Sequence, residues 1–399
     1  MNKNIEVKEN FNKKLIGVRN VKVDYLYCFI KNFDISSAIW VLYMIYKGLP
    51  LWQIGIVEGI FHVASFLFEV PSGAVADLFG RKKVMIAGRI FSALSAVINL
   101  FASNIFAFSI GFIISALGYN LNSGSEEALV YDSMKQSKCE KDYLKVNSRL
   151  NLLIEIAQGL ATFIGGVLAE YSYVWCYIVV IIISILALIV CMFFQEPDIK
   201  NNKTEYTSFS EHFNICLKVL KSDMKIINIL LYYPIIFTFD AVVFFYGQQY
   251  FNIAGCNKIQ ISLIMLYSGL LSCMGAVTCE KVIAIFKENT KYAASVLMGV
   301  SIIFISVNNI AVSIVFFGIM SYANALLYPI QSDSLNKLIP SEQRATIISI
   351  DSMLFSLSMI CIFPICGLLA DKFSLNKIFF ILGIIQLCLI GSLYINALC

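Results

Sequence analysis

Long apolar stretches alternate with short polar ones along almost the whole chain. A helix needs about 20 apolar residues to cross a membrane, because each residue adds about 1.5 Å along the axis. Twelve stretches approach or exceed that length, at 24–46, 51–76, 84–103, 105–131, 147–169, 174–195, 225–247, 258–280, 292–308, 309–330, 345–370 and 377–397. The pattern predicts an all-α integral membrane fold with a transmembrane helix in each stretch.

Composition supports a lipid environment. Hydrophobic residues make up 59% of the 399 residues and charged residues 14%, whereas soluble domains average about half apolar and about a quarter charged. The first 23 residues are polar and basic with no apolar core, so they do not resemble a cleavable signal peptide. We expect 1–23 to be a cytoplasmic N-terminal tail.

The basic residues give the expected orientation. Most of the 30 Lys and Arg residues fall in the tail and in the loops after the even-numbered stretches. Cytoplasmic loops carry this excess in membrane proteins, so we predict a multi-pass protein of the cell membrane with both termini in the cytoplasm. The longest polar segment, 196–224, is expected to be a cytoplasmic loop between a six-helix bundle at 24–195 and a second at 225–399.

A short pattern recurs four times. "GAVAD" begins at Gly73, "GVLAE" at Gly166, "GAVTCE" at Gly275 and "GLLAD" at Gly367. The first and third copies begin 202 residues apart, and the second and fourth 201 apart. Each copy ends the second helix of a three-helix unit, with alternating sidedness. This spacing predicts inverted three-helix repeats within each six-helix bundle.

The first copy carries a family resemblance. "GAVADLFGRKK" resembles the G-x-L-a-D-r-x-G-R-r-k signature of the major facilitator superfamily, with Gly73, Asp77, Gly80, Arg81 and Lys82 in place. The resemblance implies transport by alternating access, with this gating motif stabilising the outward-facing state from the cytoplasmic side.

Three parts of the gating motif have physical expectations of their own. Gly73 suits a close helix crossing, and Gly80 suits a tight turn with positive φ. Asp132, at the cytoplasmic end of the fourth stretch, is placed to join Asp77 and Arg81. Lys82 could instead serve only to set topology, and we prefer that reading for this residue.

Two charges flank the motif inside the apolar layer. Glu69 and Arg89 each lie ten residues from Phe79 at the centre of the turn, which places them about 15 Å from it at one depth in a helical hairpin. Opposite charges at equal depth on adjacent helices neutralise each other at least cost. We predict an intramembrane ion pair between Glu69 and Arg89.

Other ionisable residues inside the apolar stretches are candidates for proton coupling or substrate binding. The first choices are Asp34 and Asp240, near the middle of the first helix of each half, because burial disfavours the charged form of a carboxyl group. Asp34 could equally pair with Lys31, three residues away. The remaining candidates are Glu58, for which a solvated mouth position is the alternative, His62, for which neutral packing is the alternative, and Glu155. Glu126, Glu127 and Asp351 are expected to be hydrated near cytoplasmic ends.

The spacing E-x-P-x5-D-x3-R-K, at Glu69, Pro71, Asp77, Arg81 and Lys82, is similar to that of Gram-positive tetracycline efflux proteins. It favours a drug:proton antiporter that exports an amphipathic small molecule. Two antiporter signatures depart from the pattern: Ala161 and Thr162 stand where Gly and Pro would, and Asn120 where Arg would.

An importer of a nutrient or metabolite on the same scaffold, and a membrane receptor without transport, stay open as alternatives. We expect no enzymatic activity, no cofactor, no metal and no nucleic-acid partner. The expected partners are a small-molecule substrate, protons and the lipid bilayer, with the proton gradient as energy source and the chain as a monomer.

Overall fold

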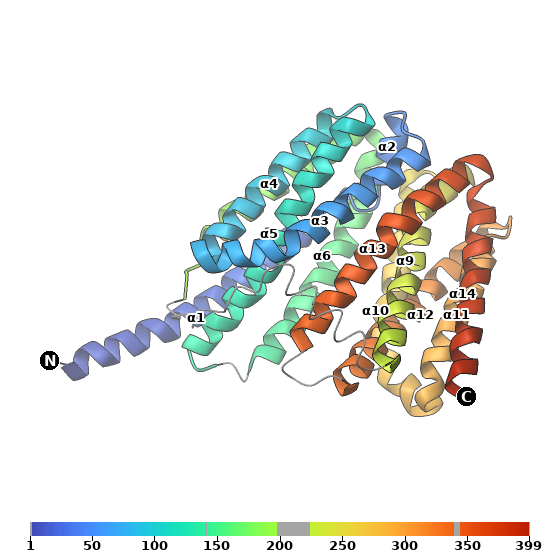
Figure 1. The fold of residues 1–399 in the computed structure, drawn as a ribbon. Coiled ribbons are helices and arrows are strands. Elements are labelled where there is room, and N and C mark those ends of the chain that lie inside the picture. Colours follow the sequence, from blue (N-terminus) through green and yellow to red (C-terminus); the bar gives the residue numbers. More distant parts are fainter. Residues whose placement is uncertain (1, 140–141, 198–223, 339–343, 399) are drawn as a thin grey trace. The chain divides into compact units, whose positions relative to one another are not determined.

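A computed structural model describes residues 2–139, 142–197, 224–338 and 344–398, and within these ranges the chain is helical (Figure 1). The helices are α1 Asn2–Asn32, α2 Trp40–Tyr46, α3 Leu51–Phe79, α4 Arg81–Phe101, α5 Ile105–Gln136, α6 Tyr143–Tyr171, α7 Tyr173–Cys191, α9 Met224–Ile253, α10 Lys258–Phe286, the short 3₁₀ helix η2 Lys287–Asn289, α11 Thr290–Ile305, α12 Ile310–Leu338, α13 Arg344–Lys372 and α14 Leu375–Leu398. The all-α prediction is confirmed for the described residues.

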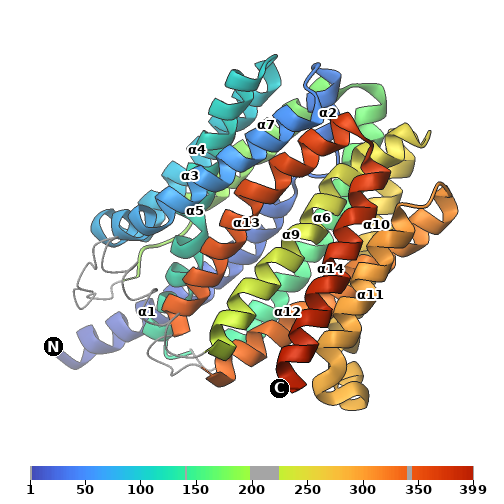
Figure 2. The ribbon, with the colours of Figure 1, turned by 45° about the vertical axis from the view of Figure 1, so that its right-hand side comes forward.

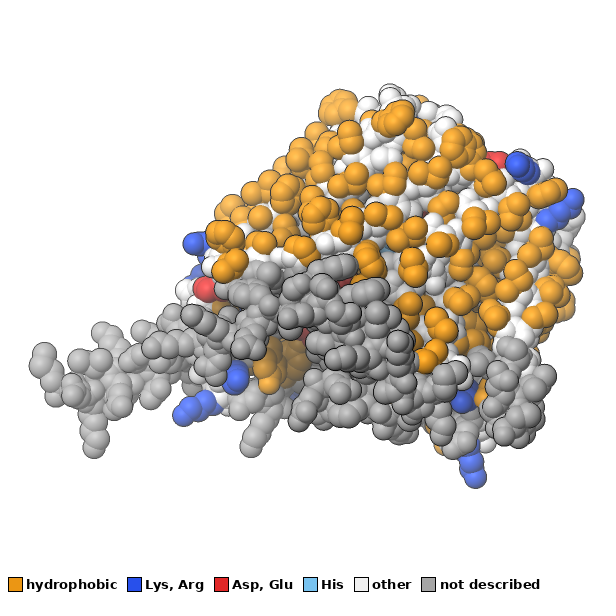
Figure 3. Space-filling model, in the orientation of Figure 1, with side chains coloured by type: hydrophobic (Ala, Val, Ile, Leu, Met, Phe, Trp, Pro, Cys, Tyr) orange, Lys and Arg blue, Asp and Glu red, His pale blue; other side chains and the backbone are white. Residues whose placement is uncertain are grey.

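Within the described ranges, nine helices are long and apolar enough to cross a membrane, and two shorter apolar segments lie at Thr290–Ile305 and Leu375–Gly391. These eleven segments correspond to the second to twelfth predicted stretches. Figure 3 shows hydrophobic side chains over most of the described face, with charged side chains mainly at its margins. The chain is therefore a multi-pass membrane protein.

The first predicted stretch is not one helix. α1 ends at Asn32 and α2 begins at Trp40, so the prediction of a continuous span at 24–46 is wrong. In the intervening segment the Asp34 side chain accepts hydrogen bonds from the backbone N–H and hydroxyl of Ser36, at 2.9 and 2.6 Å. A carboxylate that binds the backbone two residues on forms a turn that competes with helix, which explains the break.

α1 also extends into the predicted tail. Asn20 is fully buried, and its side-chain amide donates to the Ser133 hydroxyl at 2.7 Å and to the Gln195 carbonyl at 2.8 Å. The N–H of Gly17 donates to the Ser137 hydroxyl at 3.1 Å. Residues before position 24 therefore continue α1, and Gly17 and Asn20 pack on α5 and on the segment after α7, while the cytoplasmic location of 1–23 stays a prediction.

The chain divides into two compact units. The first comprises Met1–Ser37 and Ala64–Tyr206, and the second comprises Ala38–Val63 and Thr207–Cys399. The second unit therefore includes α2 and the first half of α3, although these residues precede the predicted boundary at the central loop.

Helix pairing follows the same scheme in both units. In the first unit α1 packs on α5, α6 and α7, and α4 packs on α5 and α7. In the second unit α9 packs on α12, α13 and α14, and α11 packs on α12 and α14. Figures 1 and 2 show α13 beside α9 and α11 beside α14. The scheme repeats every six segments along the chain, whereas the inverted three-helix repeat stays a prediction.

Candidate functional site

An ion pair links the last turn of α1 to the C-terminal third of α5. Lys31 pairs with Glu126, and the two side chains are 22% and 11% exposed. Burying a charge away from water costs free energy, and the cost is offset when an oppositely charged partner is in contact with it. Glu126 was expected to be hydrated, and Lys31 was considered as a partner of Asp34; the structure corrects both expectations.

Tyr27 forms the centre of the same cluster. Its side chain is fully buried, and its hydroxyl donates to Asn122 Oδ1 at 2.6 Å. The ammonium of Lys31 and the guanidinium of Arg89 lie 5.7 and 5.8 Å from the Tyr27 ring centroid. Cations at this distance from an aromatic ring are attracted by its π face. One ring thus holds a base from α1 and another from α4 next to the acid on α5.

Asp24 completes this cluster, which we call the α1–α5 charge cluster (Asp24, Tyr27, Lys31, Arg89, Asn122 and Glu126). Asp24 is 1% exposed, and neither of its carboxyl oxygens has a hydrogen-bond partner among the described residues. A buried carboxylate without a partner is strongly disfavoured, and such a group becomes neutral by binding a proton. Asp24 is therefore the candidate for proton binding in the α1–α5 charge cluster.

A sequence signal for the cluster existed. Asp24, Tyr27 and Lys31 are spaced three and four residues apart, so they lie on one face of a helix. Asp24 and Tyr27 lie near the start of the first apolar stretch and Glu126 near the end of the fourth, so position in the middle of a span does not select them.

In the second unit, Asp240 lies on α9 as predicted and meets an amide. Asn324 Nδ2, from α12, donates to Asp240 Oδ2 at 2.9 Å. Asp240 Oδ1 and Asn324 Oδ1 are buried and have no partner among the described residues. On α13, Asp351 is also less exposed than expected. Its Oδ1 accepts a hydrogen bond from Gln331 Nε2 at 2.7 Å. Both carboxyl groups thus face neutral amides.

Glu58 and His62 form a pair one turn apart on α3. Glu58 is 9% and His62 8% exposed, and His62 Nε2 lies 3.5 Å from Glu58 Oε1. The solvated mouth position preferred for Glu58 is therefore wrong, because the helix turns both side chains inward. The His62 ring also packs edge-on against Phe61 and Phe355.

Two predicted candidates lie elsewhere. Asp34 is exposed, in the turn after α1 rather than near the middle of a helix, which removes the argument from burial. Glu155 is exposed on α6. The structure does not bring Asp34 into the α1–α5 charge cluster, although Lys31 is three residues away.

The gating motif occupies the turn between α3 and α4. Gly80 has φ +89°, the positive value expected for this tight turn. Arg81 pairs with Asp132 on α5, and the Arg81 guanidinium also donates to the Ala128 carbonyl at 2.5 Å. Sequence reasoning placed Asp132 near Arg81. Asp77 lies on α3, and its side chain is outside the described part of the structure.

Glu196 is a missed member of this turn. Its carboxylate accepts hydrogen bonds from the N–H groups of Arg81 and Lys82, both at 2.8 Å, and so caps the start of α4. Gly73 is exposed, and no described atom comes within 4 Å of a Cβ built there. The close helix crossing expected at Gly73 therefore has no counterpart among the described residues, and it stays a prediction.

The Glu69–Arg89 contact stays a prediction. Arg89 is 8% exposed with its guanidinium over Tyr27, and its Nε has no hydrogen-bond partner among the described residues. Glu69 is partly exposed, and its backbone carbonyl accepts from the Ser72 hydroxyl at 2.7 Å. The structure thus gives Arg89 a defined neighbour on α1.

Comparison with known proteins defines the class. Residues 27–300 match the family model of the Major Facilitator Superfamily, so the chain belongs to this superfamily and is a membrane transporter of that type. It is similar to the uncharacterized MFS-type transporter YxaM of Bacillus subtilis, with 24% identity and 88% of this chain and 89% of that protein covered.

Solved structures share the fold. The nucleoside transporter NupG superposes with a TM-score of 0.77 at 12% identity, covering 94% of this chain and 98% of NupG. A D-xylose–proton symporter superposes with a TM-score of 0.71 at 14% identity, covering 94% of this chain and 97% of that one. At these identities the likeness shows the fold alone.

Proposed function

We propose that the protein is a proton-coupled transporter that exports an amphipathic small molecule by alternating access. The observation that carries the proposal is the α1–α5 charge cluster, in which a buried carboxyl group without a partner lies near a buried ion pair. Groups of this kind inside a membrane helix bundle bind and release protons.

Protons can act on the cluster through the Lys31–Glu126 pair. A proton on Glu126 removes its negative charge, so Lys31 loses the partner that offsets its burial. The ammonium must then move toward water, toward Asp24 or toward an anionic group. Because Lys31 lies on α1 and Glu126 on α5, proton binding changes the free energy of holding these two helices together. This link between protonation and helix packing is what proton-coupled transport requires.

The substrate class rests on the intramembrane acids and on aromatic side chains. Among the described residues, the Asp240 carboxylate is hydrogen-bonded to a neutral amide. α9 also presents Phe244 and Phe245, whose rings pack with Phe317 and with Trp40. A carboxylate with aromatic neighbours suits a planar, cationic, amphipathic compound. Export follows from the similarity of the Glu69 to Lys82 spacing to that of tetracycline efflux proteins.

Import of a polar metabolite is the second candidate. The Tyr27 hydroxyl and the Asn122 amide form a specific hydrogen-bonding site of the kind that a nutrient transporter needs, and NupG is a nucleoside transporter. The two candidates differ in cargo and direction and share the same coupling cluster.

The test uses inverted membrane vesicles with an imposed pH gradient. Ethidium and tetracycline are added as export probes, and uridine and xylose as import probes, while a pH-sensitive dye records proton movement. We expect movement of an export probe to be accompanied by proton release. In the double variant Lys31→Gln/Glu126→Gln, we expect the rate of this proton release to fall at least ten-fold. Proton-independent movement of the probe would contradict coupling, and proton movement with uridine or xylose would replace export by import.

Glu127→Gln provides the matched control. Glu127 is the next residue on α5 but is exposed, and its Oε1 accepts from the Tyr143 hydroxyl at 3.1 Å. Burial, with the Glu127 carboxylate beside it, raises the pKa of Tyr143, so this hydroxyl stays a donor across the tested range. We expect the control to retain the native rate, since it removes a carboxylate without touching the cluster.

A further inference from the structure

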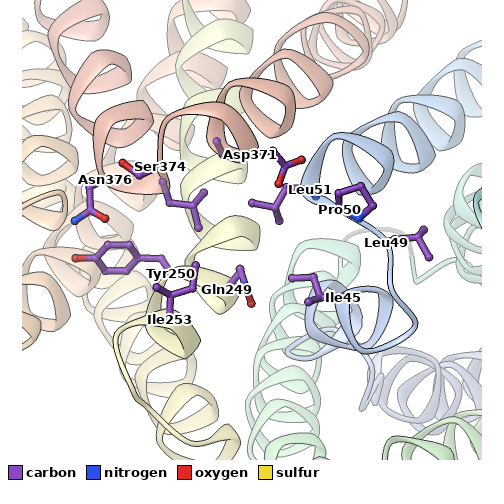
Figure 4. Close-up of a pocket in the computed structure, with 12 residues that line it drawn as sticks. Ile45, Leu49, Pro50, Leu51, Gln249, Tyr250, Ile253, Asp371, Ser374 and Asn376 are labelled. Atoms are coloured by element: carbon purple, nitrogen blue, oxygen red, sulfur yellow. Dashed lines mark hydrogen bonds between the residues drawn. The ribbon is translucent and has the colours of Figure 1, made fainter.

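The first turn of α3 is held by a carboxylate from far along the chain. Asp371, at the end of α13, accepts hydrogen bonds from the N–H groups of Leu51 at 3.2 Å and Trp52 at 2.8 Å. The first N–H groups of a helix lack intrahelical partners and carry partial positive charge, so a carboxylate is stabilised there. Figure 4 shows Asp371 next to Leu51 and Pro50, where α3 begins.

The backbones of α3 and α13 also approach closely further along the two helices. A Cβ built at Gly55 would lie 2.7 Å from the Cα of Pro364, so a larger residue would not fit without a shift. The Tyr246 hydroxyl, fully buried on α9, donates to the carbonyls of Leu51 at 3.4 Å and Phe363 at 3.1 Å. Asp371 thus holds the rim of a tightly packed contact.

This contact explains why the second unit includes residues 38–63. They come from the first half of the sequence, yet they pack with α9 and α13. In the predicted topology, the turn before α3 and the turn after α13 both lie outside the cell. The contact therefore lies at the predicted outer ends of α3 and α13, within the second unit.

Asp371 also has a counterpart in the repeated pattern. It follows Gly367 by four residues, just as Asp77 follows Gly73 in the gating motif. The family resemblance gives Asp77 a role in closing the cytoplasmic side. The two acids end the second helices of repeats with opposite predicted orientation.

We infer that Asp371 is the clamp of an outer gate: it fixes the first turn of α3 on α13 when the outer side is closed, and it releases this turn when that side opens. The inference rests on the proposed function, because a gate matters only for alternating access. A cavity of about 290 Å³, lined by residues that include Pro50, Tyr250 and Asn376, borders the clamp. Asp371 itself is exposed, so water reaches the clamp.

Cys366 offers a reporter for this gate. It is 4% exposed, and it precedes Gly367, where a built Cβ would lie 2.5 Å from the Leu51 carbonyl oxygen of α3. We therefore expect a thiol reagent to reach Cys366 faster when α3 moves away from α13. Intact cells are treated with a membrane-impermeant maleimide, and modification of Cys366 is quantified by mass spectrometry in the full-length protein. We expect Asp371→Ala to accelerate labelling at least five-fold, and Asp371→Glu, which keeps a carboxylate, to stay within two-fold of the native rate.

Glu196→Gln is the matched control, because Glu196 caps α4 in the first unit by the same kind of contact. It should not accelerate labelling of Cys366. Equal labelling in Asp371→Ala and the native protein, or an equal rise in Glu196→Gln, would overturn the gate. Labelling requires no substrate, so it tests the gate separately from transport. If Asp371→Ala accelerates labelling but the protein moves no protons in the vesicle assay, the proposed function is overturned and the gate is not.

Discussion

Each half of the chain begins with a predicted membrane segment that contains an acid, and the two acids have different surroundings. This segment is α1 together with α2 in the first half and α9 in the second half. In the first half the helix breaks at Asn32, and Asp34 turns outward to bind Ser36. In the second half α9 runs unbroken from Met224 to Ile253 across Pro234, and Asp240 meets Asn324. The acids take similar positions in the sequence and different environments.

Charge compensation differs as well. α1 holds Lys31 against Glu126 and keeps Asp24 nearby, so the first unit combines a charged pair with a buried carboxyl group that has no hydrogen-bond partner among the described residues. α9 holds its acid against a neutral amide. Depth in a span therefore does not fix the environment of an acid, because the side chains that face it differ between α1 and α9.

The largest expected effect comes from breaking the pair on α1. Lys31→Met leaves Glu126 without a partner, and loss of one member of a buried pair costs about 3–5 kcal/mol. The double variant Lys31→Met/Glu126→Gln removes both charges, so we expect it to recover most of that loss. Thermal unfolding of the purified protein in detergent, monitored by circular dichroism, measures the difference. A Lys31→Met variant as stable as the native protein would show that the pair is hydrated.

Several features of the molecule can be predicted from particular residues of the sequence. Apolar length and the motif at Gly73 predict the helices, the membrane and the superfamily, because lipid exposure and a tight Gly80 turn leave direct marks in sequence. The contact between Arg81 and Asp132 also follows, since both lie at helix ends that the sequence predicts to be on the same side of the membrane.

The α1–α5 charge cluster was harder to predict. Whether Lys31 binds Asp34 or Glu126 depends on rotation of α1 against α5, which hydrophobic periodicity does not set in a bundle that is apolar on all sides. The break at Asn32 depends on the two hydrogen bonds that the Asp34 side chain accepts from Ser36. The clamp of Asp371 on α3 joins residues about 320 positions apart, beyond the reach of local pattern.

A smaller effect on stability, with a large one on coupling, is expected at Asp240. Asp240→Asn preserves size and one hydrogen bond to Asn324, so the free energy of unfolding should change by about 1 kcal/mol or less. An amide cannot carry the proton, so the dependence of transport on the pH gradient should fall at least ten-fold. Vesicle transport with and without the gradient measures this. Full gradient dependence in Asp240→Asn would confine coupling to the first unit.

A substitution of Asn324, the amide that donates to Asp240, tests whether the hydrogen bond or the proton carries the effect. Asn324→Ala leaves Asp240 without its described hydrogen-bond donor, and we expect a loss of about 1–3 kcal/mol in the free energy of unfolding. Because the carboxyl group persists, gradient-dependent transport should be reduced rather than abolished. If Asn324→Ala and Asp240→Asn reduce gradient dependence equally, the hydrogen bond rather than the proton carries the effect.

The smallest effect is expected at Asp34. Asp34→Ala removes the hydrogen bonds to Ser36 and should cost about 0.5–1 kcal/mol, as loss of a comparable side-chain cap does. Asp34→Asn keeps an oxygen acceptor for the same turn, so its thermal unfolding should match the native protein. Both variants should retain gradient-dependent transport, because Asp34 is exposed and faces Ser36 rather than the charge cluster. Loss of gradient dependence in Asp34→Asn, with stability unchanged, would reverse the comparison and make the broken segment between α1 and α2 the site of proton coupling.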